Sequence, residues 1–106
     1  MTLDEVKKEI SDFTKERNWD QYHTPENLAK SISIEAGELL ECFQWSPDYD
    51  RQAVIEELAD VMNYCIQMAD KLNINIEDAI VEKIKKNAEK YPVEKCYGSS
   101  KKYTEL

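Results

Sequence analysis

Long stretches of this sequence contain neither proline nor glycine, and this scarcity of helix breakers restricts the fold more than any other feature. The 106 residues include only three prolines and two glycines, and the prolines lie between segments of periodic hydrophobicity. Proline and glycine most often interrupt helices, so their scarcity leaves room for long ones. Within these segments apolar residues recur every three or four positions, the period of an amphipathic helix. The sequence therefore predicts an all-α fold that resembles a four-helix bundle.

Residues typical of helix ends divide the chain into four expected helices. Each start carries a residue that caps helix N-termini, and the second start also has Pro25 at its first helical position. The last helix must stop at Tyr91, because Pro92 follows. The expected ranges are 2–17 with Thr2 as cap, 24–44 with Thr24 as cap, 50–72 from Asp50, and 75–91 with Asn75 as cap.

One domain is expected, because 106 residues are a common domain size and 42% apolar residues suffice for one modest core. The periodic pattern ends at Pro92, so residues 1–92 are predicted to form the helical domain and residues 93–106 a largely irregular tail. Some apolar residues lie outside the main stripes of their helices, which predicts a homo-oligomer, either a dimer or a tetramer. They include Ile34, Ile55, Ile66 and Val81.

Composition excludes several classes of partner. The net charge of −8 repels a phosphate backbone, so no nucleic-acid polymer is expected as a partner. No segment approaches the roughly 18 apolar residues of a membrane span, and residues 1–8 carry charge where a signal peptide has its apolar run. We therefore expect a cytoplasmic protein with no membrane partner. The three cysteines are widely spaced and form no C-x-x-C pair, which indicates neither a disulfide framework nor a thiolate zinc site.

Two acidic pairs occupy equivalent positions on the second and third expected helices. Glu35 and Glu38 lie about 60° and about 120° to one side of the centre of the apolar stripe, at about 100° per residue. Glu57 and Asp60 have the same offsets on the third helix. If the two helices pack antiparallel, as their short connection suggests, the four carboxylates converge on one crevice. The alternative is that both pairs are solvated helix faces, which is the usual role of acidic pairs.

Converging carboxylates predict a bound divalent cation. Like charges in a partly desolvated crevice raise one another's pKa, and a divalent ion removes this cost. All four candidate ligands are oxygens, so Mg²⁺ fits best, with Mn²⁺ as a possible substitute. A carboxylate-bridged redox metal is the less favoured alternative, because bundle sites of that kind usually carry E-x-x-H pairs and this sequence has none.

The fourth helix carries polar donors within its apolar stripe. Lys83 and Asn87 lie in the stripe, and Tyr91 closes it one turn later. This set of ammonium, amide and phenol groups suits a phosphate clamp opposite a metal site. Lysines that extend over apolar surface toward water are the alternative.

Aromatic residues flank the second helix. Trp19 and His23 precede it, and Trp45 follows it. Such rings can form a slot for a flat ligand such as a nucleobase, with His23 or Gln21 hydrogen-bonded to its edge. Equally, they can close the ends of the bundle, which is the commoner use of aromatic residues in loops.

Several longer motifs, taken together, are specific for a known family. The motifs are RNWDQYHTP at 17–25, EAGEL at 35–39, FQW at 43–45, EELADV at 56–61 and KNAEKYP at 86–92. With them the sequence resembles, from about residue 13 to residue 95, the MazG-like all-α nucleoside triphosphate pyrophosphohydrolases. In that family E-x-x-E followed about twenty residues later by E-x-x-D is the Mg²⁺-binding signature. The resemblance therefore implies that the metal ligands are Glu35, Glu38, Glu57 and Asp60.

The same resemblance implies a substrate site and an activity. Trp19 and Trp45 match positions that line the base pocket, and the residues that match those facing the phosphates and sugar are Lys83, Asn87 and Tyr91. The implied reaction is Mg²⁺-dependent cleavage of a nucleoside triphosphate to its monophosphate and pyrophosphate, in house-cleaning of the nucleotide pool. Glu38 is the expected base for the attacking water. The rival interpretation is a non-catalytic helical module whose acidic crevice binds a cation or a partner helix.

Overall fold

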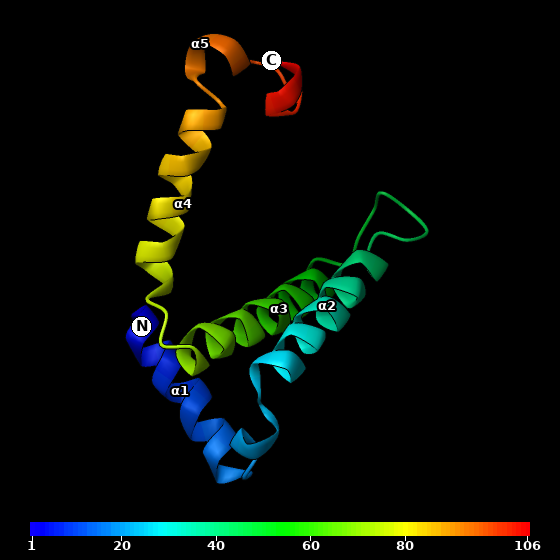
Figure 1. Cartoon of the computed structure of the whole chain (residues 1–106). Helices are drawn as coiled ribbons and strands as arrows, with labels where there is room; N and C mark the ends of the chain where they lie inside the picture. Colours follow the sequence, from blue (N-terminus) through cyan, green and yellow to red (C-terminus); the bar gives the residue numbers. More distant parts are fainter. The chain divides into compact units, whose positions relative to one another are not determined.

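The computed structural model describes all 106 residues, and its regular elements are all helical (Figure 1). The elements are α1 (Leu3–Glu16), η1 (Asp20–Tyr22), α2 (Pro25–Glu41), α3 (Arg51–Lys71), α4 (Ile76–Lys90), α5 (Val93–Cys96) and η2 (Tyr103–Glu105), where η denotes a 3-10 turn. The all-α prediction is confirmed, with a short fifth helix added to the four that were expected. None of the helices combines the length and apolarity that a membrane crossing requires.

The predicted starts of all four long helices are confirmed by side-chain caps. Thr2 and Thr24 each accept a hydrogen bond at 3.2 Å from the backbone N–H three residues later, and Asn75 accepts one at 3.0 Å. Asp50 accepts from the N–H of Gln52 at 2.9 Å. These side chains satisfy backbone donors that have no partner within their own helix.

Helix α2 ends at Glu41, three residues before the expected end at residue 44. The N–H groups of Cys42, Phe43 and Gln44 bond to carbonyls three residues back, so the chain tightens into turns. The aromatic pair Phe43 and Tyr49, with ring centroids 5.1 Å apart, then closes the connection to α3.

Two asparagines in the left-handed conformation follow α1 and α3. Asn18 and Asn73 both have φ of 54°, a region that asparagine tolerates better than most residues. The N–H of Trp19 reaches back to the carbonyl of Thr14 at 2.9 Å, and Ile74 bonds in the same way to Ala69 at 2.8 Å. These bonds satisfy carbonyls at the helix ends and set the direction in which the chain leaves each helix.

The first compact unit, Met1–Ile74, contains α1, α2 and α3. Helices α2 and α3 lie side by side and run antiparallel, as expected, and α1 packs against α3 (Figure 1). The buried apolar residues are Leu28, Ile66 and Ala69. Thr14 is also buried, and its hydroxyl donates to the carbonyl of Ser11 at 3.0 Å, which offsets the cost of burying a polar group.

The second compact unit, Asn75–Leu106, contains α4, α5 and η2. The two units divide after Ile74, inside the expected domain of residues 1–92. The tail from residue 93 is more ordered than expected, because α5 and η2 lie within it. Its end returns to α4, where the N–H of Tyr103 donates to the hydroxyl oxygen of Tyr91 at 3.2 Å.

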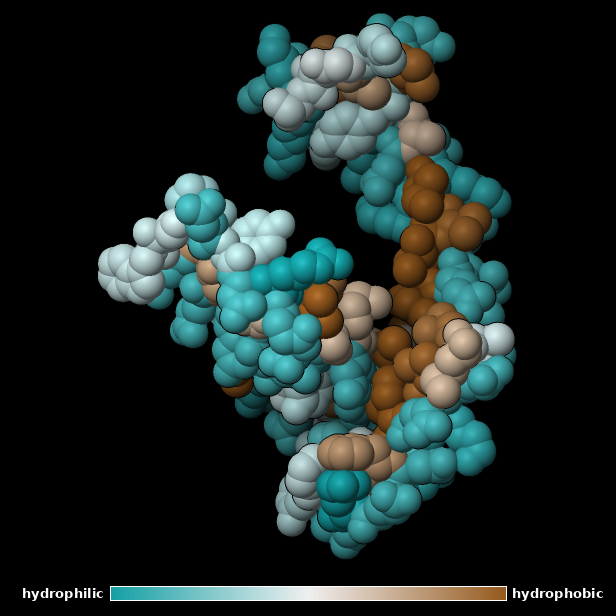
Figure 2. Space-filling view, turned by 180° about the vertical axis from the view of Figure 1, so that it is seen from behind, coloured by the Kyte–Doolittle hydropathy of each residue, from teal (hydrophilic) through white to brown (hydrophobic).

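Many large apolar side chains remain accessible. On α4, Ile80, Val81 and Ile84 are 53%, 50% and 59% exposed, and Figure 2 shows a band of hydrophobic residues along this helix. On α2, Ile34 and Leu40 are likewise exposed. Apolar patches of this kind usually mark surfaces that another protein surface covers.

We therefore expect the protein to be a homo-oligomer in solution. Covering these side chains removes apolar area from water, which stabilises the assembly by about 25 cal/mol per Å² of buried area. Static light scattering at micromolar concentration should give at least twice the chain mass of 12.4 kDa. Replacement of Ile84 by Glu should shift the mass toward that of one chain, because it places a charge on the apolar surface. A wild-type mass near 12.4 kDa would contradict the prediction.

Candidate metal centre and adjoining cavity

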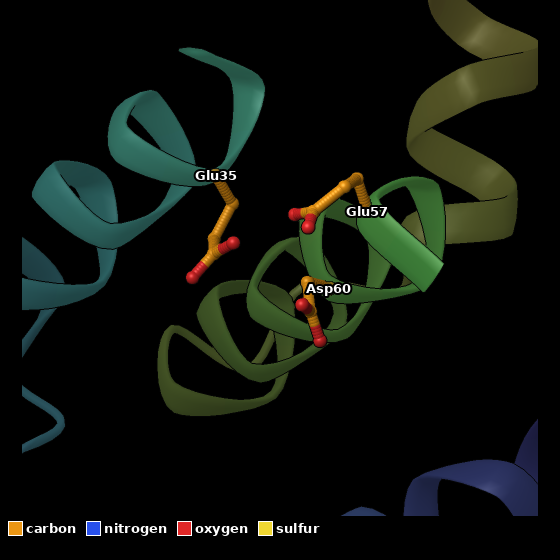
Figure 3. Close-up of side chains that lie close together, drawn as sticks. All are labelled: Glu35, Glu57 and Asp60. Atoms are coloured by element: carbon orange, nitrogen blue, oxygen red, sulfur yellow. The ribbon is translucent and has the colours of Figure 1, made fainter. Parts of the chain in front are cut away.

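Three carboxylates from two helices converge in the first compact unit. Glu35 projects from α2, and Glu57 and Asp60, one turn apart, project from α3 toward the same space (Figure 3). One ligand oxygen of each lies within 4.8 Å of the others. Oxygens on opposite sides of a single Mg²⁺ or Ca²⁺ ion are about 4–5 Å apart. The three side chains are therefore spaced so that they can hold one metal ion.

Glu38 joins this group from the next turn of α2. Its carboxyl lies close enough to those of Glu35 and Glu57 to raise the pKa of both. It is not among the three residues whose oxygens are mutually close, and its side chain is exposed. The structure thus brings all four predicted carboxylates to one place, with three in a tight set and Glu38 at its edge.

The electrostatics of the cluster are those of crowded negative charges. A hydrogen bond with the Glu38 carboxyl, followed by burial, raises the pKa of Glu35 to about 7, and the charges of neighbouring carboxylates add to the shift. Burial also raises the pKa of Glu57, together with its hydrogen bond to Glu38. Both effects disfavour the ionised form. The cluster therefore holds a proton more readily than isolated carboxylates do.

Two oxygens in the cluster have no hydrogen-bond partner although they are buried. They are Oε2 of Glu35 and Oε2 of Glu57. An unsatisfied buried carboxylate oxygen is costly unless a proton or a cation approaches it. The donor set consists of carboxylate oxygens alone, which suits a hard divalent cation such as Mg²⁺ or Mn²⁺ better than a soft one.

The segment between α1 and α2 is held in place by three contacts. The ring of Trp19 meets the ring of Phe13 edge to face at 5.7 Å between centroids. The side-chain amide of Asn27 donates to the carbonyl of Tyr22 at 2.8 Å, which ties η1 to the first turn of α2. An ion pair at 3.0 Å joins Asp20 to Lys71 at the end of α3. Together these contacts fix Trp19 and the following residues against α1 and α3.

A cavity of about 180 Å³ lies beside the carboxylate cluster. It is lined by residues of α1, of the segment before α2, and of α3: Ile10, Phe13, Thr14, Trp19, His23, Asp60, Asn63, Tyr64 and Gln67. Asp60 belongs both to this lining and to the carboxylate cluster. His23 packs edge to face on Tyr64 at 6.4 Å, and its Nδ1 is buried without a partner.

A larger cavity, of about 280 Å³, shares four lining residues with the first one: Ile10, Thr14, His23 and Gln67. None of the four clustered carboxylates lines it, and three lysines do: Lys7, Lys15 and Lys71. We assign the candidate site to the smaller cavity, because Asp60 lines it and the cavity therefore adjoins the clustered carboxylate oxygens.

The structure adds cavity residues that the sequence patterns did not single out. Asn63, Tyr64 and Gln67 extend the face of α3 that carries Glu57 and Asp60. The available signal was the helical spacing itself, because Tyr64 lies one turn after Asp60. That spacing also fits a residue of the core, and so it did not mark Tyr64 as part of a site.

Other predicted site residues lie away from this cavity or in the second unit. Trp45 is 88% exposed in the connection between α2 and α3 and does not line the cavity. Lys83 and Asn87 are exposed on α4, and Tyr91 is half-buried at its end. They follow the helical face of Ile80 and Ile84 in the second unit, as the sequence predicts.

Fold and site together define a class of all-helical proteins with an inter-helix carboxylate centre. Within that class, the chain belongs to the MazG-like family, whose model matches residues 30–106. It is 36% identical to dCTP pyrophosphatase 1 of Mus musculus and of Homo sapiens, over 99% of this chain and 68% of each relative. It is also similar to the crystal structure of a pyrophosphatase from Archaeoglobus fulgidus, with a TM-score of 0.78 and 41% identity over 85% of this chain and 92% of that one. The expected family is thereby confirmed.

The raised pKa of Glu35 predicts how the stability of the metal-free protein depends on pH. Its pKa is about 7 in the folded protein and 4.5 in the ordinary state, so the folded state favours the protonated form. This contribution to stability is complete below the ordinary pKa and is lost as pH rises through about 7. With EDTA present, the melting temperature of Glu35→Gln should therefore exceed that of wild type by a margin that grows as the pH is raised from about 5 to about 8.

A matched control is Glu41→Gln, on the same helix but outside the cluster. A plot of its melting temperature against pH should stay parallel to that of wild type across the same pH range. Parallel curves for Glu35→Gln as well would show that Glu35 does not bind its proton more tightly in the folded state.

Proposed function

We propose that this protein is a Mg²⁺-dependent nucleoside triphosphate pyrophosphohydrolase, which cleaves a ribo- or deoxyribonucleoside triphosphate to the monophosphate and pyrophosphate. The observation that carries the proposal is the position of Asp60, which belongs to both the carboxylate cluster and the ring-lined cavity. A ligand with a flat ring in the cavity then has its polar part beside the cluster. The names of the relatives support a pyrophosphatase. House-cleaning of the nucleotide pool is the proposed role.

The residues proposed to hold Mg²⁺ are Glu35, Glu57 and Asp60, with Glu38 as a fourth ligand or as a base. Their fit rests on the orphaned oxygens of Glu35 and Glu57 and on the oxygen-only donor set. A divalent ion held by these residues would offset the charge of the phosphates and lower the pKa of the attacking water. Glu38 is suited to accept the proton of that water, because its exposed carboxyl stands at the edge of the tight set.

The cavity beside the cluster is proposed to take the nucleobase. Small-molecule pockets usually measure about 300–1,000 Å³, so this cavity suits one part of a nucleotide rather than the whole. Trp19 supplies a ring face or edge, and the unpartnered Nδ1 of His23 supplies a hydrogen-bonding atom. Trp45, exposed in its loop, is proposed as a further contact to the base.

The donors of α4 are proposed to bind the phosphates and sugar. Lys83 supplies an ammonium group, Asn87 an amide and Tyr91 a phenol, along one face of the helix. Cationic and neutral donors of this kind stabilise phosphate oxygens during transfer.

The products of the reaction test this proposal directly. With Mg²⁺ or Mn²⁺ present, a panel of nucleoside triphosphates should yield the monophosphate and pyrophosphate, detected by chromatography of both products. Complete chelation should abolish hydrolysis, because the clustered carboxylates repel the phosphates unless a cation lies between them. Orthophosphate as the first product would contradict the cleavage position, and absence of hydrolysis across the panel would favour a non-catalytic module.

Asp60→Asn separates a functional role of Asp60 from a structural one. The substitution keeps the side-chain size and removes like-charge repulsion, so the metal-free variant should be at least as stable as wild type. A ligand at a hundred times its dissociation constant adds about 2.7 kcal/mol, on the order of ten degrees in melting temperature. Wild type should show such a gain with Mg²⁺, and Asp60→Asn should lose most of that gain and nearly all activity.

Asp48→Asn is the matched control, because Asp48 lies exposed in the connection between α2 and α3 and outside the cluster. Its Mg²⁺ response and turnover should equal those of wild type, with a change in stability of at most about 0.5 kcal/mol. If Asp60→Asn behaves in the same way, Asp60 is not a metal ligand.

A further inference from the structure

The C-terminal segment of the second unit holds Tyr91 at several points. The backbone N–H of Tyr103 donates to the hydroxyl oxygen of Tyr91 at 3.2 Å, and the two rings meet edge to face with centroids 6.0 Å apart and planes at 82°. The thiol of Cys96 donates to the carbonyl of Tyr91 at 3.3 Å. Both the main chain and the ring of Tyr91 are therefore fixed by residues that follow α4.

These contacts determine how the Tyr91 hydroxyl can be used. A phenol has one proton to donate and lone pairs that accept. The N–H of Tyr103 occupies an acceptor position, so the proton of Tyr91 is directed elsewhere, and no protein group accepts it. A hydroxyl that accepts a hydrogen bond becomes a better donor, because the two bonds polarise each other. The hydroxyl proton of Tyr91 can therefore be donated to a bound ligand.

The surrounding charge favours an anionic acceptor. The ammonium of Lys90 lies 4.9 Å from the ring centroid of Tyr103, a cation–π contact that keeps a positive charge beside the two tyrosines. Residues 83–106 contain seven lysines and three acidic residues, whereas residues 1–82 contain seven basic and nineteen acidic residues. The end of α4 and the tail therefore form the basic part of an otherwise acidic chain.

We infer that Tyr103 is a positioning residue, which holds the Tyr91 hydroxyl as a hydrogen-bond donor to a phosphate oxygen of a di- or triphosphate ligand. The inference rests on the proposed function, in which Tyr91 contacts the phosphates of the substrate. Tyr103 touches Tyr91 and Lys90, and it acts through them rather than on the ligand. Tyr103 thereby contributes to phosphate binding although it lies in the C-terminal tail.

A double-mutant cycle tests the inference, with binding of Mg²⁺-pyrophosphate measured by calorimetry on the full chain. Tyr91→Phe removes the hydroxyl, and Tyr103→Ala removes the ring that holds it. Each should weaken pyrophosphate binding about tenfold, the loss expected for a hydrogen bond to a charged group. The double variant should bind no more weakly than Tyr91→Phe, because Tyr103 then has no hydroxyl to position.

Further variants distinguish positioning from simple support of the tail. Tyr103→Phe keeps the ring and the backbone N–H and should restore wild-type affinity. Tyr103→Leu keeps apolar bulk without an aromatic ring, and its affinity for pyrophosphate should match that of Tyr103→Ala. It replaces the alanine variant in the cycle if alanine unfolds the tail. Tyr97→Ala is the matched control, because Tyr97 is 89% exposed in the same tail and makes no aromatic pair. It should leave affinity unchanged.

Each outcome bears on the inference separately from the proposed function. The positioning role would be overturned by any of three results. They are losses of affinity that add in the double variant, an unchanged affinity in Tyr103→Ala, and no pyrophosphate binding by wild type. If the cycle behaves as expected but no nucleoside triphosphate is hydrolysed, the positioning role stands and the proposed hydrolase activity fails. If hydrolysis occurs and the cycle is additive, only the positioning role fails.

Discussion

Two carboxylate oxygens, one from Glu35 and one from Glu57, are buried between α2 and α3 without a hydrogen-bond partner. The packing of these two helices is the most extensive helix contact in the first unit, so the carboxylates cannot separate without loosening it. Interaction with the Glu38 carboxyl and burial raise the pKa of Glu35, and burial followed by interaction with Glu38 raises that of Glu57, so ionisation of the metal-free cluster is unfavourable. A divalent cation between the carboxylates would offset this charge, which is the physical basis of the proposed Mg²⁺ site.

The cavity depends on a different set of interactions, which are local to the chain between α1 and α2. The left-handed Asn18 turns the backbone so that Trp19 meets Phe13, and the ion pair between Asp20 and Lys71 holds the segment against α3. An exposed ion pair contributes at most about 1 kcal/mol, so the aromatic contacts and the backbone reversal carry most of this positioning. Asp60 connects the two systems, because it lies in both the cluster and the cavity wall.

Charge is distributed unevenly along the chain, and this distribution matches the division into two compact units. The first unit carries the acidic centre, and all the lysines of the second unit follow residue 82. In the proposed function, the phosphate oxygens of the substrate are bound by cationic and neutral hydrogen-bond donors. The folded tail around Tyr91 and Tyr103 holds such donors in an ordered form, whereas a disordered tail would lose entropy on binding.

The positions of the four long helices could be predicted from the sequence alone, because the interactions that start and stop a helix are local. Thr2, Thr24, Asp50 and Asn75 cap the helices they were predicted to start, since each cap bonds to a backbone N–H two or three residues away. The equal angular offsets of the two acidic pairs also indicated that carboxylates would meet between α2 and α3. Both results follow from helical geometry, which depends on residues near in sequence.

Contacts between residues far apart in the chain decided three features that the sequence did not predict. They are the cavity, the division of the four carboxylates into a tight set of three with Glu38 at its edge, and the folding of the tail onto α4. Periodicity could not separate Tyr64, in the cavity wall, from an ordinary core residue, and it could not place Glu38 at the edge of the carboxylate set. The return of Tyr103 to Tyr91 spans twelve residues without a periodic signal. Such contacts arise from how helices pack and how loops close in three dimensions, and local residue preferences do not encode them individually.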